Sequence, residues 1–503
     1  MFKKYLSIFV ALFLFSACAG TMKNREMCGK LAENVKSKKY DEALKNVKHE
    51  DFYPQENSKL LKNLETGTVY YLRGDYYQAL KYFESAKKIS DDLYTISIKK
   101  KIASGWDANL DEYYGERYER SLIRFYISLI NYNIYQQGFY EEYTDDEGNV
   151  IPRKDLSDTE RNFHLGYARS SIIEWDSLLQ TMQNESLGEA IYKNDMMAKI
   201  WGAFIHSEFE NSNDRQISLQ LYRDADELLL RGYNMYPIFN NKSDVFNKDF
   251  KKLPNITFQQ LHKDYIDETK YAKELKEFIN RNLKNLERYK KDNVVILVKD
   301  DLISPKSVKT IEIPFPLTSF GPQGSDLYEF ARLVMSTKEN MPYVVIEFPE
   351  IKSRNIVNNY KATVFDNNGD EVAETDLTLL EPLSDIAKKT LDDKSALIKT
   401  AIISRITAKY VAAIASAYAV YSQGGTFAQL SAMAMFVASA KAINESSRAD
   451  IRYWTTLASD IQMGGLRLDD GDYRVEISMN GQKIFEKNIQ VKKGKTSFID
   501  INN

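Results

Sequence analysis

The chain has 503 residues, enough for two to four domains, and its 68 basic and 71 acidic residues leave a net charge of −3. Because it has no basic excess and no long run of one sign, the composition argues against nucleic acid as a partner. The only two cysteines, Cys18 and Cys28, argue against a disulfide scaffold, so we expect stability to come from an apolar core.

The N-terminus has the pattern of a signal peptide over residues 1–17. A basic pair precedes an apolar stretch, residues 5–15, that is too short to span a bilayer as a mature helix. The letters FSAC that follow are similar to a bacterial lipobox. They predict acylation of Cys18 and a lipidated tether over residues 18–30.

The residue after Cys18 indicates a destination for the protein. Ala19 stands there rather than Asp, and by analogy with lipoproteins of diderm bacteria this favours an outer-membrane anchor facing the periplasm. Several acyl chains, at ~0.8 kcal/mol for each buried CH₂, would hold the chain at the membrane without a transmembrane helix. An ordinary secretory peptide cut near Ala17 or Ala19 is the alternative interpretation.

The stretch from Leu64 to Ile89 has the spacing of one tetratricopeptide helix–turn–helix repeat. Its small residues let two antiparallel helices approach closely, and its aromatic residues fill the space beside the contact. Such a pair cannot bury its apolar face alone, so neighbouring pairs must stack on it. The residues predicted to form the packing contact are Gly67, Tyr70, Gly74, Tyr76, Ala79, Phe83 and Ala86.

Other stretches indicate helix pairs of the same kind, so we expect tetratricopeptide-like repeats over residues 31–290. Tyr40 precedes Tyr76 by 36 residues, close to the period that stacked pairs require. Residues 111–135 place apolar side chains every three to four positions, which predicts one buried helical stripe. Residues 198–229 repeat the small and aromatic pattern on two further helices.

One part of this helical half combines aromatic area with charges of both signs, as recognition surfaces often do. Core packing is the alternative interpretation, because the tyrosines fall at helical spacing. The residues of this candidate interaction surface are Tyr113, Tyr114, Arg117 and Arg120.

The sequence offers no constellation for catalysis or metal binding, and we predict no enzymatic activity and no cofactor. A wall-active enzyme would need paired acids or an activated nucleophile, whereas Glu116 and Glu119 have the spacing of an ordinary solvated pair on one helix. The histidines are scattered singly, without a carboxylate or cysteine at metal-ligand spacing: His49, His164, His206 and His262.

The pattern changes near residue 290, where strands replace helices. Residues 291–382 and 461–503 contain apolar runs and alternating segments, which we assign to the first and final parts of one small antiparallel β-sandwich. Asn368-Gly369 and Asn480-Gly481 predict two hairpin turns. The predicted fold class is therefore α+β, with an N-terminal solenoid followed by a sandwich whose middle is interrupted.

The interruption, residues 383–460, is predicted to be a helical hairpin rich in Ala and Ser, with its turn at Gly424-Gly425. Small residues permit close helix contacts, in lipid as well as in water. A membrane hairpin is the alternative to a tight soluble hairpin with an oligomerisation surface. Arg405, Lys409 and Lys441 argue against it, because each arm alone falls short of ~20 apolar residues.

After the hairpin, Asp450, Arg452 and Trp454 alternate where the chain returns to the sandwich. An acid, a guanidinium and an indole at this point belong to our candidate interaction surface, as a rim for a ligand. The structural alternative is that Asp450 and Arg452 pair while Trp454 plugs the junction.

Three stretches in this order resemble the bacterial envelope lipoproteins with tetratricopeptide-like repeats, a family of unknown function. They are residues 113–132 (YYGERYERSLIRFYISLINY), 294–316 (VVILVKDDLISPKSVKTIEIPFP) and 449–477 (ADIRYWTTLASDIQMGGLRLDDGDYRVEI). Leu302-Ile303-Ser304 and Ala458 depart from the family pattern, which has Gly before the Pro-Lys step and Pro after the Trp-x-x-Leu. The resemblance implies an envelope role beside lipoproteins that activate peptidoglycan synthases, and it implies no enzymatic activity.

These observations together predict an outer-membrane-anchored periplasmic scaffold or adaptor. Its expected partners are envelope proteins or a peptide segment, the membrane through acyl chains, and further copies of the chain. The alternative is a structural subunit of a large envelope machine, motor-associated or secretory, assembled through the Ala-rich hairpin.

Overall fold

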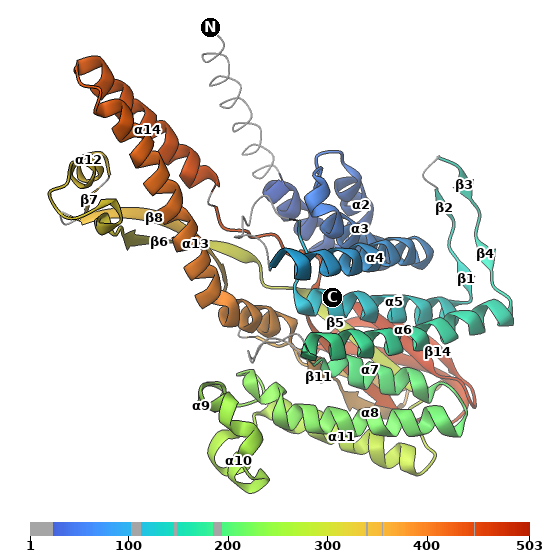
Figure 1. Cartoon of the computed structure of the whole chain (residues 1–503). Coiled ribbons are helices and arrows are strands. Elements are labelled where there is room, and N and C mark those ends of the chain that lie inside the picture. The colour runs from blue at the N-terminus through green and yellow to red at the C-terminus, as the bar shows by residue number, and fades with distance from the viewer. Residues whose placement is uncertain are drawn as a thin grey trace.

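The structure is a computed structural model that describes residues 24–101, 112–144, 148–184, 194–335, 337–338, 341–354, 356–446 and 448–503. Cys18 and the predicted signal peptide lie outside these residues. The fold is mixed α+β, 57% helical and 20% strand. A body of helices and sheets carries a projecting arm (Figure 1).

The helices of the body pack as consecutive antiparallel pairs, of which α3–α4, α5–α6 and α7–α8 have the most extensive contacts. The long amphipathic helices each present an apolar face to a shared core. Their bounds are α2 (Tyr40–Lys48), α3 (Lys59–Arg73), α4 (Tyr76–Lys101), α5 (Arg117–Gln137), α6 (Asp158–Asn184), α7 (Met196–Ser207), α8 (Ser212–Arg231), α9 (Ser243–Asp249), α10 (Phe258–Tyr265) and α11 (Lys270–Glu287).

The predicted helix pair over residues 64–89 is confirmed as α3 and α4. Gly74 ends α3 with φ of 87°, a left-handed conformation that favours glycine. A Cβ on Gly67 would lie 3.0 Å from the ring of Phe83, so only glycine allows this approach. Ala79 and Ala86 are fully buried in α4. The identification of these pairs as a tetratricopeptide solenoid stays a prediction.

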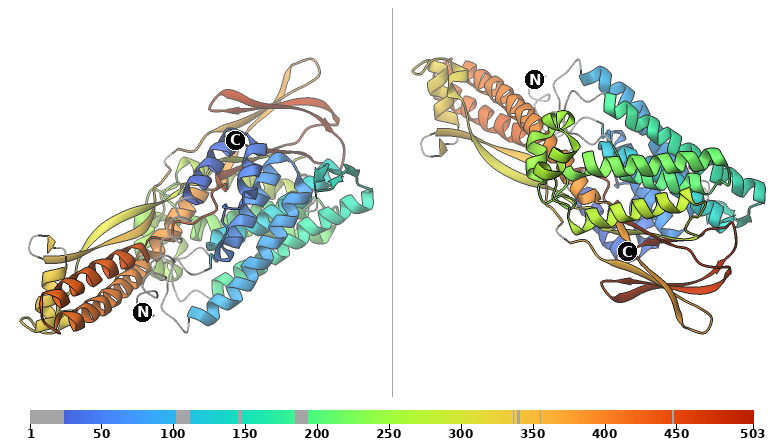
Figure 2. Two further views of the ribbon diagram at one scale, coloured as in Figure 1. Left: turned by 90° about the horizontal axis from the view of Figure 1, so that it is seen from above. Right: turned by 90° about the horizontal axis from the view of Figure 1, so that it is seen from below.

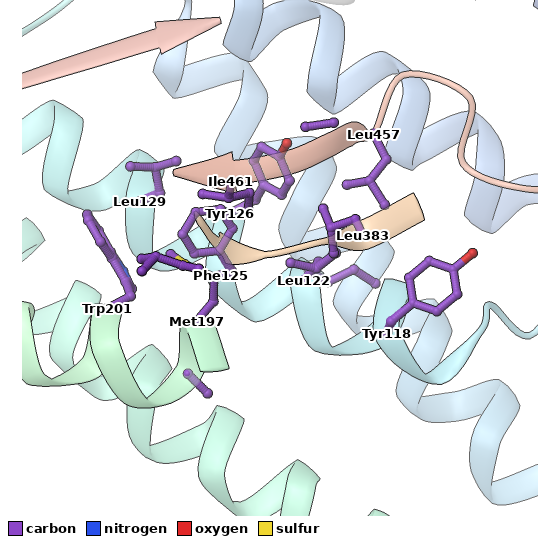
Figure 3. Close-up of a cluster of buried hydrophobic side chains, with 14 of the residues drawn as sticks. Tyr118, Leu122, Phe125, Tyr126, Leu129, Met197, Trp201, Leu383, Leu457 and Ile461 are labelled. Atoms are coloured by element: carbon purple, nitrogen blue, oxygen red, sulfur yellow. The ribbon is translucent and has the colours of Figure 1, made fainter. Parts of the chain in front are cut away.

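Helix α5 lies at the centre of the body rather than on one side of it. Every residue from Tyr118 to Ile134 is buried, whereas the sequence predicted a single buried stripe. Figure 3 shows why: Phe125 lies beside Trp201 and Met197 of α7, while Tyr126 and Leu122 lie toward the strand of Ile461 and the start of the arm at Leu383. A helix enclosed by other elements buries all of its faces.

Two four-stranded sheets form the other half of the body, in the orders β11-β12-β5-β15 and β10-β9-β13-β14. The first sheet lies between the helices and the second sheet, and the two sheets share one apolar cluster. Their strands are β5 (Val294–Leu302), β9 (Tyr360–Phe365), β10 (Glu371–Asp376), β11 (Thr378–Glu381), β12 (Ala458–Leu466), β13 (Gly471–Met479), β14 (Gln482–Val491) and β15 (Ser497–Asn502).

The continuous apolar run of β5 follows from this layering. Val294, Ile296 and Val298 face the second sheet, whereas Val295 and Leu297 join the core shared with the helices. A strand segment covered on both faces favours a near-continuous run of apolar residues.

The strand pairing confirms some predictions and corrects one. Hairpins join β9 to β10 and β13 to β14, with positive φ at Gly369 and at Asn480-Gly481 as predicted. The prediction of a purely antiparallel arrangement is wrong, because β15 pairs in parallel with β5. The sandwich as a named architecture stays a prediction.

A narrow β-ribbon joins α5 to α6. Within it β1 pairs with β4 and β2 with β3, both antiparallel. In Figure 1 this ribbon extends away from the body on the side opposite the arm. Its strands are β1 (Phe139–Tyr140), β2 (Tyr143–Thr144), β3 (Val150–Ile151) and β4 (Lys154–Asp155).

The arm is built from two excursions of the chain and has its own apolar cluster. The first excursion leaves after β5 and the second follows β11, and both views in Figure 2 show them together beyond the body. The prediction assigned residues 291–382 wholly to the sandwich, but β6 pairs with β8 and packs against the arm helices instead. The arm elements are β6 (Lys306–Pro314), α12 (Asp326–Val334), β7 (Thr337–Lys338), β8 (Met341–Ile351), α13 (Leu383–Tyr421) and α14 (Thr426–Ser446).

Candidate interaction surface

Trp454, a predicted surface residue, is a fully buried plug between helices and sheet. Its ring lies 5.3 Å from that of Tyr126 and 5.7 Å from that of Phe83, centroid to centroid. The indole N–H donates to the hydroxyl of Thr68 at 2.9 Å, and the backbone N–H donates to Glu119 at 2.9 Å. Trp454 therefore plugs the junction, as the structural alternative predicted. It does not form the rim of a ligand site.

Asp450 and Arg452 form an ion pair at the same junction. The Arg452 guanidinium donates to both carboxylate oxygens of Asp450, at 3.0 and 2.8 Å, and also to the backbone oxygen of Asn57 at 3.3 Å. It lies over the ring of Tyr113, 5.5 Å from its centroid. Both charged side chains are partly buried, so the pair joins the end of the arm to the start of α3.

The residues predicted around position 113 are likewise internal. Tyr113 is 6% exposed and donates its hydroxyl proton to Glu119, while Arg120 is 4% exposed and donates to Ser90 at 3.2 Å. Tyr114 and Arg117 are half-buried. The predicted interaction surface is therefore wrong at Tyr113, Arg120 and Trp454, because core packing and hydrogen bonds use these side chains.

The acids expected to be solvated are also internal. Glu116 caps α5 in a reciprocal capping box with Glu119, whose carboxylate accepts from the Glu116 backbone N–H at 2.7 Å. Burial raises the pKa of Glu119, whereas Lys394 and Lys306 outweigh burial at Glu116 and hold its pKa well below its usual range. Glu116 thereby links the body to two elements at the base of the arm.

A further buried acid, Glu65, fixes the chain just beyond Trp454. It accepts hydrogen bonds from the backbone N–H groups of Thr455 and Thr456, at 2.6 and 3.1 Å. Burial raises the pKa of Glu65 to about 7, and these hydrogen bonds oppose the rise. This role could not be predicted from the sequence, because a glutamate within a helix is usually exposed.

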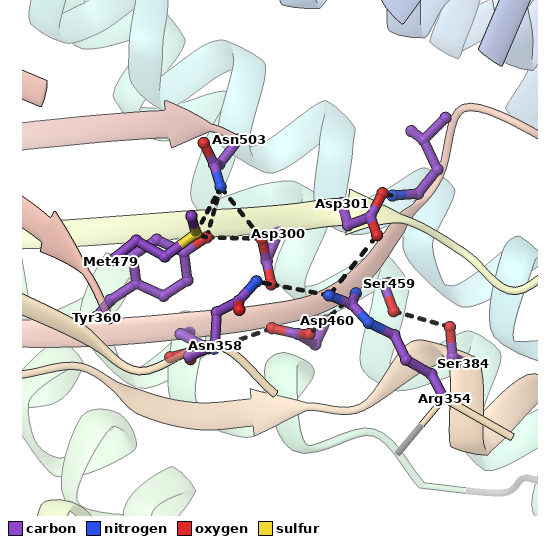
Figure 4. A network of polar contacts seen from close by, with 12 residues as sticks. Asp300, Asp301, Arg354, Asn358, Tyr360, Ser384, Ser459, Asp460, Met479 and Asn503 are labelled. Carbon is purple, nitrogen blue, oxygen red and sulfur yellow. Dashed lines mark hydrogen bonds and ion pairs between the residues drawn. The ribbon is translucent and has the colours of Figure 1, made fainter. Parts of the chain in front are cut away.

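A polar network lies where the chain returns from the arm to β9 (Figure 4). Asp300 and Asp460 are directly opposite each other on β5 and β12, and both are buried. Arg354 approaches them at 3.3 and 3.6 Å, and Tyr360 donates to Asp300 at 2.6 Å. Burial, together with the charge of Asp300, raises the pKa of Asp460 to about 7.

Metal binding finds no support in these clusters. Across the part of the chain that the structure describes, no group of His, Cys, Asp and Glu side chains could hold a metal ion. His206 pairs with Asp214, and His164 contacts Asn131 and Tyr140, each at hydrogen-bond distance. These histidines have structural partners within the body.

The arm carries a group of exposed apolar side chains on α14. Helix α14 has no charged residue from Thr426 to Ala440, and Phe427 is 85% exposed. Further large apolar side chains of this helix are exposed: Leu430, Met433, Met435 and Val437. Contiguous apolar surface of this kind marks interaction sites. The arm, rather than the junction, is therefore the candidate interaction surface.

Composition alone would let part of this helix cross a membrane. Thr426–Asn444 is the one span among the described residues that is long and apolar enough, and 17% of it is buried. One such helix is weak evidence of a membrane span, so its contacts must decide what it binds.

The sequence predicted the hairpin but not which face of it is exposed. The available signal was the spacing of large residues in α14, which lie on several sides of the helix instead of on one stripe. Comparison with protein-family models, with curated proteins and with solved structures finds no match to this chain.

Proposed function

We propose that this chain is an outer-membrane-anchored periplasmic lipoprotein that acts as a scaffold or adaptor in cell-envelope assembly. The observation that carries the proposal is the arm, which has its own core and yet exposes an apolar helix without a charged residue from Thr426 to Ala440. The resemblance to envelope lipoproteins supports the location and suggests a link to peptidoglycan synthesis.

The body is suited to hold such an arm in a fixed position. Glu116 of the body contacts Lys306 at 3.0 Å and Lys394 at 2.6 Å, one on β6 and one on α13. Arg354 holds the returning chain on Asp300. Ionic contacts of this kind define geometry more than they add stability.

The anchor has a direct test, because acylation depends on one thiol. Cys18→Ala should abolish labelling by a fatty acid fed to the cells and should release the protein from the membrane fraction. Cys28→Ala is the matched control, since that residue lies within the described body beside Tyr53. Unchanged labelling of the Cys18 variant would refute the lipobox interpretation.

The scaffold role is tested by photo-crosslinking in intact cells, followed by mass spectrometry. A photoreactive residue at Phe427 samples the arm, and one at Tyr289, which is 81% exposed on the body, is the matched control. We expect position 427 to capture a defined protein that position 289 does not. Identical products from both positions would contradict a scaffold that works through the arm.

A structural subunit of a large envelope machine is the second candidate, and one feature of α13 favours it. Its outward stripe consists of small exposed residues at alternating spacings of four and three, which lets another helix approach closely. The residues are Ala408, Ala412, Ala415, Ala419 and Ser422. Detergent extraction separates the candidates: a discrete monomer or dimer favours the adaptor, and a ring or large complex favours the machine.

A further inference from the structure

Two buried carboxylates face each other across the pairing of β5 and β12. Asp300 and Asp460 are register partners on these neighbouring strands, and they are 1% and 2% exposed. Like charges directly opposite each other destabilise a sheet, and burial strengthens their repulsion. Figure 4 shows the guanidinium of Arg354 beside both carboxylates.

The two carboxylates have unequal hydrogen-bond partners. Asp300 accepts from the hydroxyl of Tyr360 at 2.6 Å and from the amide of Asn358 at 2.8 Å. Within the described part of the chain, the side chain of Asp460 accepts one hydrogen bond, from Gln462 at 3.1 Å. Hydrogen bonds to a carboxylate favour its ionised form, so Asp460 is the acid of this pair that keeps a proton more readily.

The cations around the pair do not neutralise a second charge there. Nη2 of Arg354 lies 3.3 Å from Asp300 and 3.7 Å from Asp301. Nη1 of Arg354 is buried without a hydrogen-bond partner and lies 3.6 Å from Asp460. Lys36 pairs with Asp301 at 2.8 Å. Loss of the proton from Asp460 therefore adds a negative charge beside Asp300 without adding a hydrogen-bonded cation.

Asp460 is the member of this cluster that titrates near neutral pH. Burial, followed by the charge of Asp300, raises the pKa of Asp460 to about 7. Burial also raises the pKa of Tyr360, so its hydroxyl remains a donor. On the other side of the cluster, the main-chain oxygen of Asn503 accepts from the N–H of Asp301 at 2.9 Å. The cluster thus gains one buried negative charge as the pH rises through about 7.

The chain that covers these acids is held mainly by side chains. We call residues 352–354 and 356–358 the return segment, because they lead from β8 of the arm back to β9. No backbone–backbone hydrogen bond joins them to other residues that the structure describes. Arg354 and Asn358 fasten the segment to Asp300, and Ile356 is 67% exposed. A segment held in this way can move without breaking a strand pair.

We propose that the return segment is a proton-dependent latch over the acid pair of Asp300 and Asp460. With a proton on Asp460 the segment lies closed over the pair. Loss of that proton opens the segment, because water that reaches the acids solvates the added charge. Since β8 ends directly before the segment, opening loosens one attachment of the arm to the body. The latch goes beyond the scaffold function and does not depend on it, because it belongs to the single chain.

Distances between two spin labels in the full chain test the latch. One label replaces Ile356 on the return segment, and the other replaces Val372, which is 47% exposed on β10. Both native cysteines are replaced by alanine. We expect one narrow distance distribution at about pH 5.5 and a broader, longer one at about pH 8.5, with a midpoint near 7. Asp460→Asn cannot ionise and should keep the narrow distribution at both pH values.

Two further variants complete the test. Asp300→Asn removes the charge opposite Asp460 and should also prevent the opening at about pH 8.5, so it tests the latch even if Asp460→Asn does not fold. Asp469→Asn changes an exposed acid and should retain the wild-type response. A wild-type distribution that is the same at both pH values would overturn the proposal. So would a broadening that persists in a folded Asp460→Asn or Asp300→Asn variant.

Discussion

Helices α5 and α14 have the same length, 21 residues, and opposite relations between composition and burial. α5 carries several charged residues and is buried from Tyr118 to Ile134, whereas α14 is uncharged over most of its length and largely exposed. The difference shows that apolar content did not decide which helix forms the core. Burial follows from whether the surrounding elements supply partners, and an apolar helix left exposed calls for a partner outside the chain.

The buried polar groups of α5 show how the surrounding elements of the body supply partners to a buried helix. Ser121 donates to Asp195 at 2.6 Å and accepts from the indole of Trp175, and Asn131 contacts His164 at 2.7 Å. Ser121 and Asn131 thus have hydrogen-bond partners within the body, as most buried polar groups do. The outer face of α14 is not enclosed by other elements, so its side chains stay exposed to solvent.

The largest difference is expected when the same charge is introduced into a buried and into an exposed helix position. Ala79→Glu forces a carboxylate into a fully buried position of α4 and should unfold the N-terminal helices. Ala434→Glu makes the same change on the exposed side of α14 and should leave the fold intact. Circular dichroism and thermal melting measure both variants. Equal melting of the two would show that α3 and α4 are not packed as described.

Removal of one aromatic ring from each region should give the next largest difference. Trp454→Ala leaves a cavity among Phe83, Tyr126 and the strands, and it should cost about 3–5 kcal/mol of unfolding free energy. Phe427→Ala removes a ring that is 85% exposed and should change stability by less than about 0.5 kcal/mol. Urea unfolding of the single copies at low concentration measures both. A large loss in Phe427→Ala would mean that α14 is covered within one chain.

The acid pair at the base of the arm should make stability depend on pH. Burial raises the folded-state pKa of Asp460 to about 7, while an unfolded Asp titrates near ~4, so between these values the folded state binds the extra proton. Stability therefore falls as pH rises from about 4 to about 7 and then levels off. Asp460→Asn should reduce this fall, by at most about 4 kcal/mol.

Urea unfolding at several pH values provides the measurement, and Asp469→Asn, which changes an exposed acid, is the control. The control should keep the wild-type slope. If Asp460→Asn also keeps it, the network around Arg354 and Asp300 compensates the buried charge more fully than the geometry indicates.

The sequence was sufficient to predict many of the helices and hairpins, but not α12 within residues 291–382, and less so the environments of these elements. The close approach at Gly67, the turns at Gly369 and Gly481 and the change near residue 290 depend on local backbone chemistry, so they could be predicted. Pairing between distant segments could not, because nothing local to β15 indicates that it lies parallel to β5. The same limit applies to β6, which leaves the sheets for the arm.

The prediction of the interaction surface at Tyr113 and Trp454 was wrong for a related reason. Tyr113 and Trp454 have the composition of a recognition surface, but burial depends on segments hundreds of residues away, such as the Thr68 hydroxyl that binds the Trp454 indole. The hairpin and its small residues could be predicted because helical periodicity is local. Its exposed face became identifiable only when Ala432 and Phe436 were found packed in the arm core.

Removal of one ionic contact between body and arm should cause the smallest loss of stability among these predictions, and a local one. Lys306 is 6% exposed and donates to Glu116 at 3.0 Å and to the backbone oxygen of Arg452 at 3.2 Å. Lys306→Met keeps the buried stem but removes both contacts, which should cost about 1–3 kcal/mol while Lys394 still pairs with Glu116.

Lys309→Met on the same strand is the matched control for this change, because Lys309 is 59% exposed and pairs with Glu350 only at 3.5 Å. Its cost should stay below about 0.5 kcal/mol, as for most exposed ion pairs. Distances between spin labels on the body and on α14 should broaden in Lys306→Met and not in Lys309→Met. If neither the stability nor the distances change, the ion pairs of Glu116 do not position the arm, and the apolar packing of α13 on the body is sufficient.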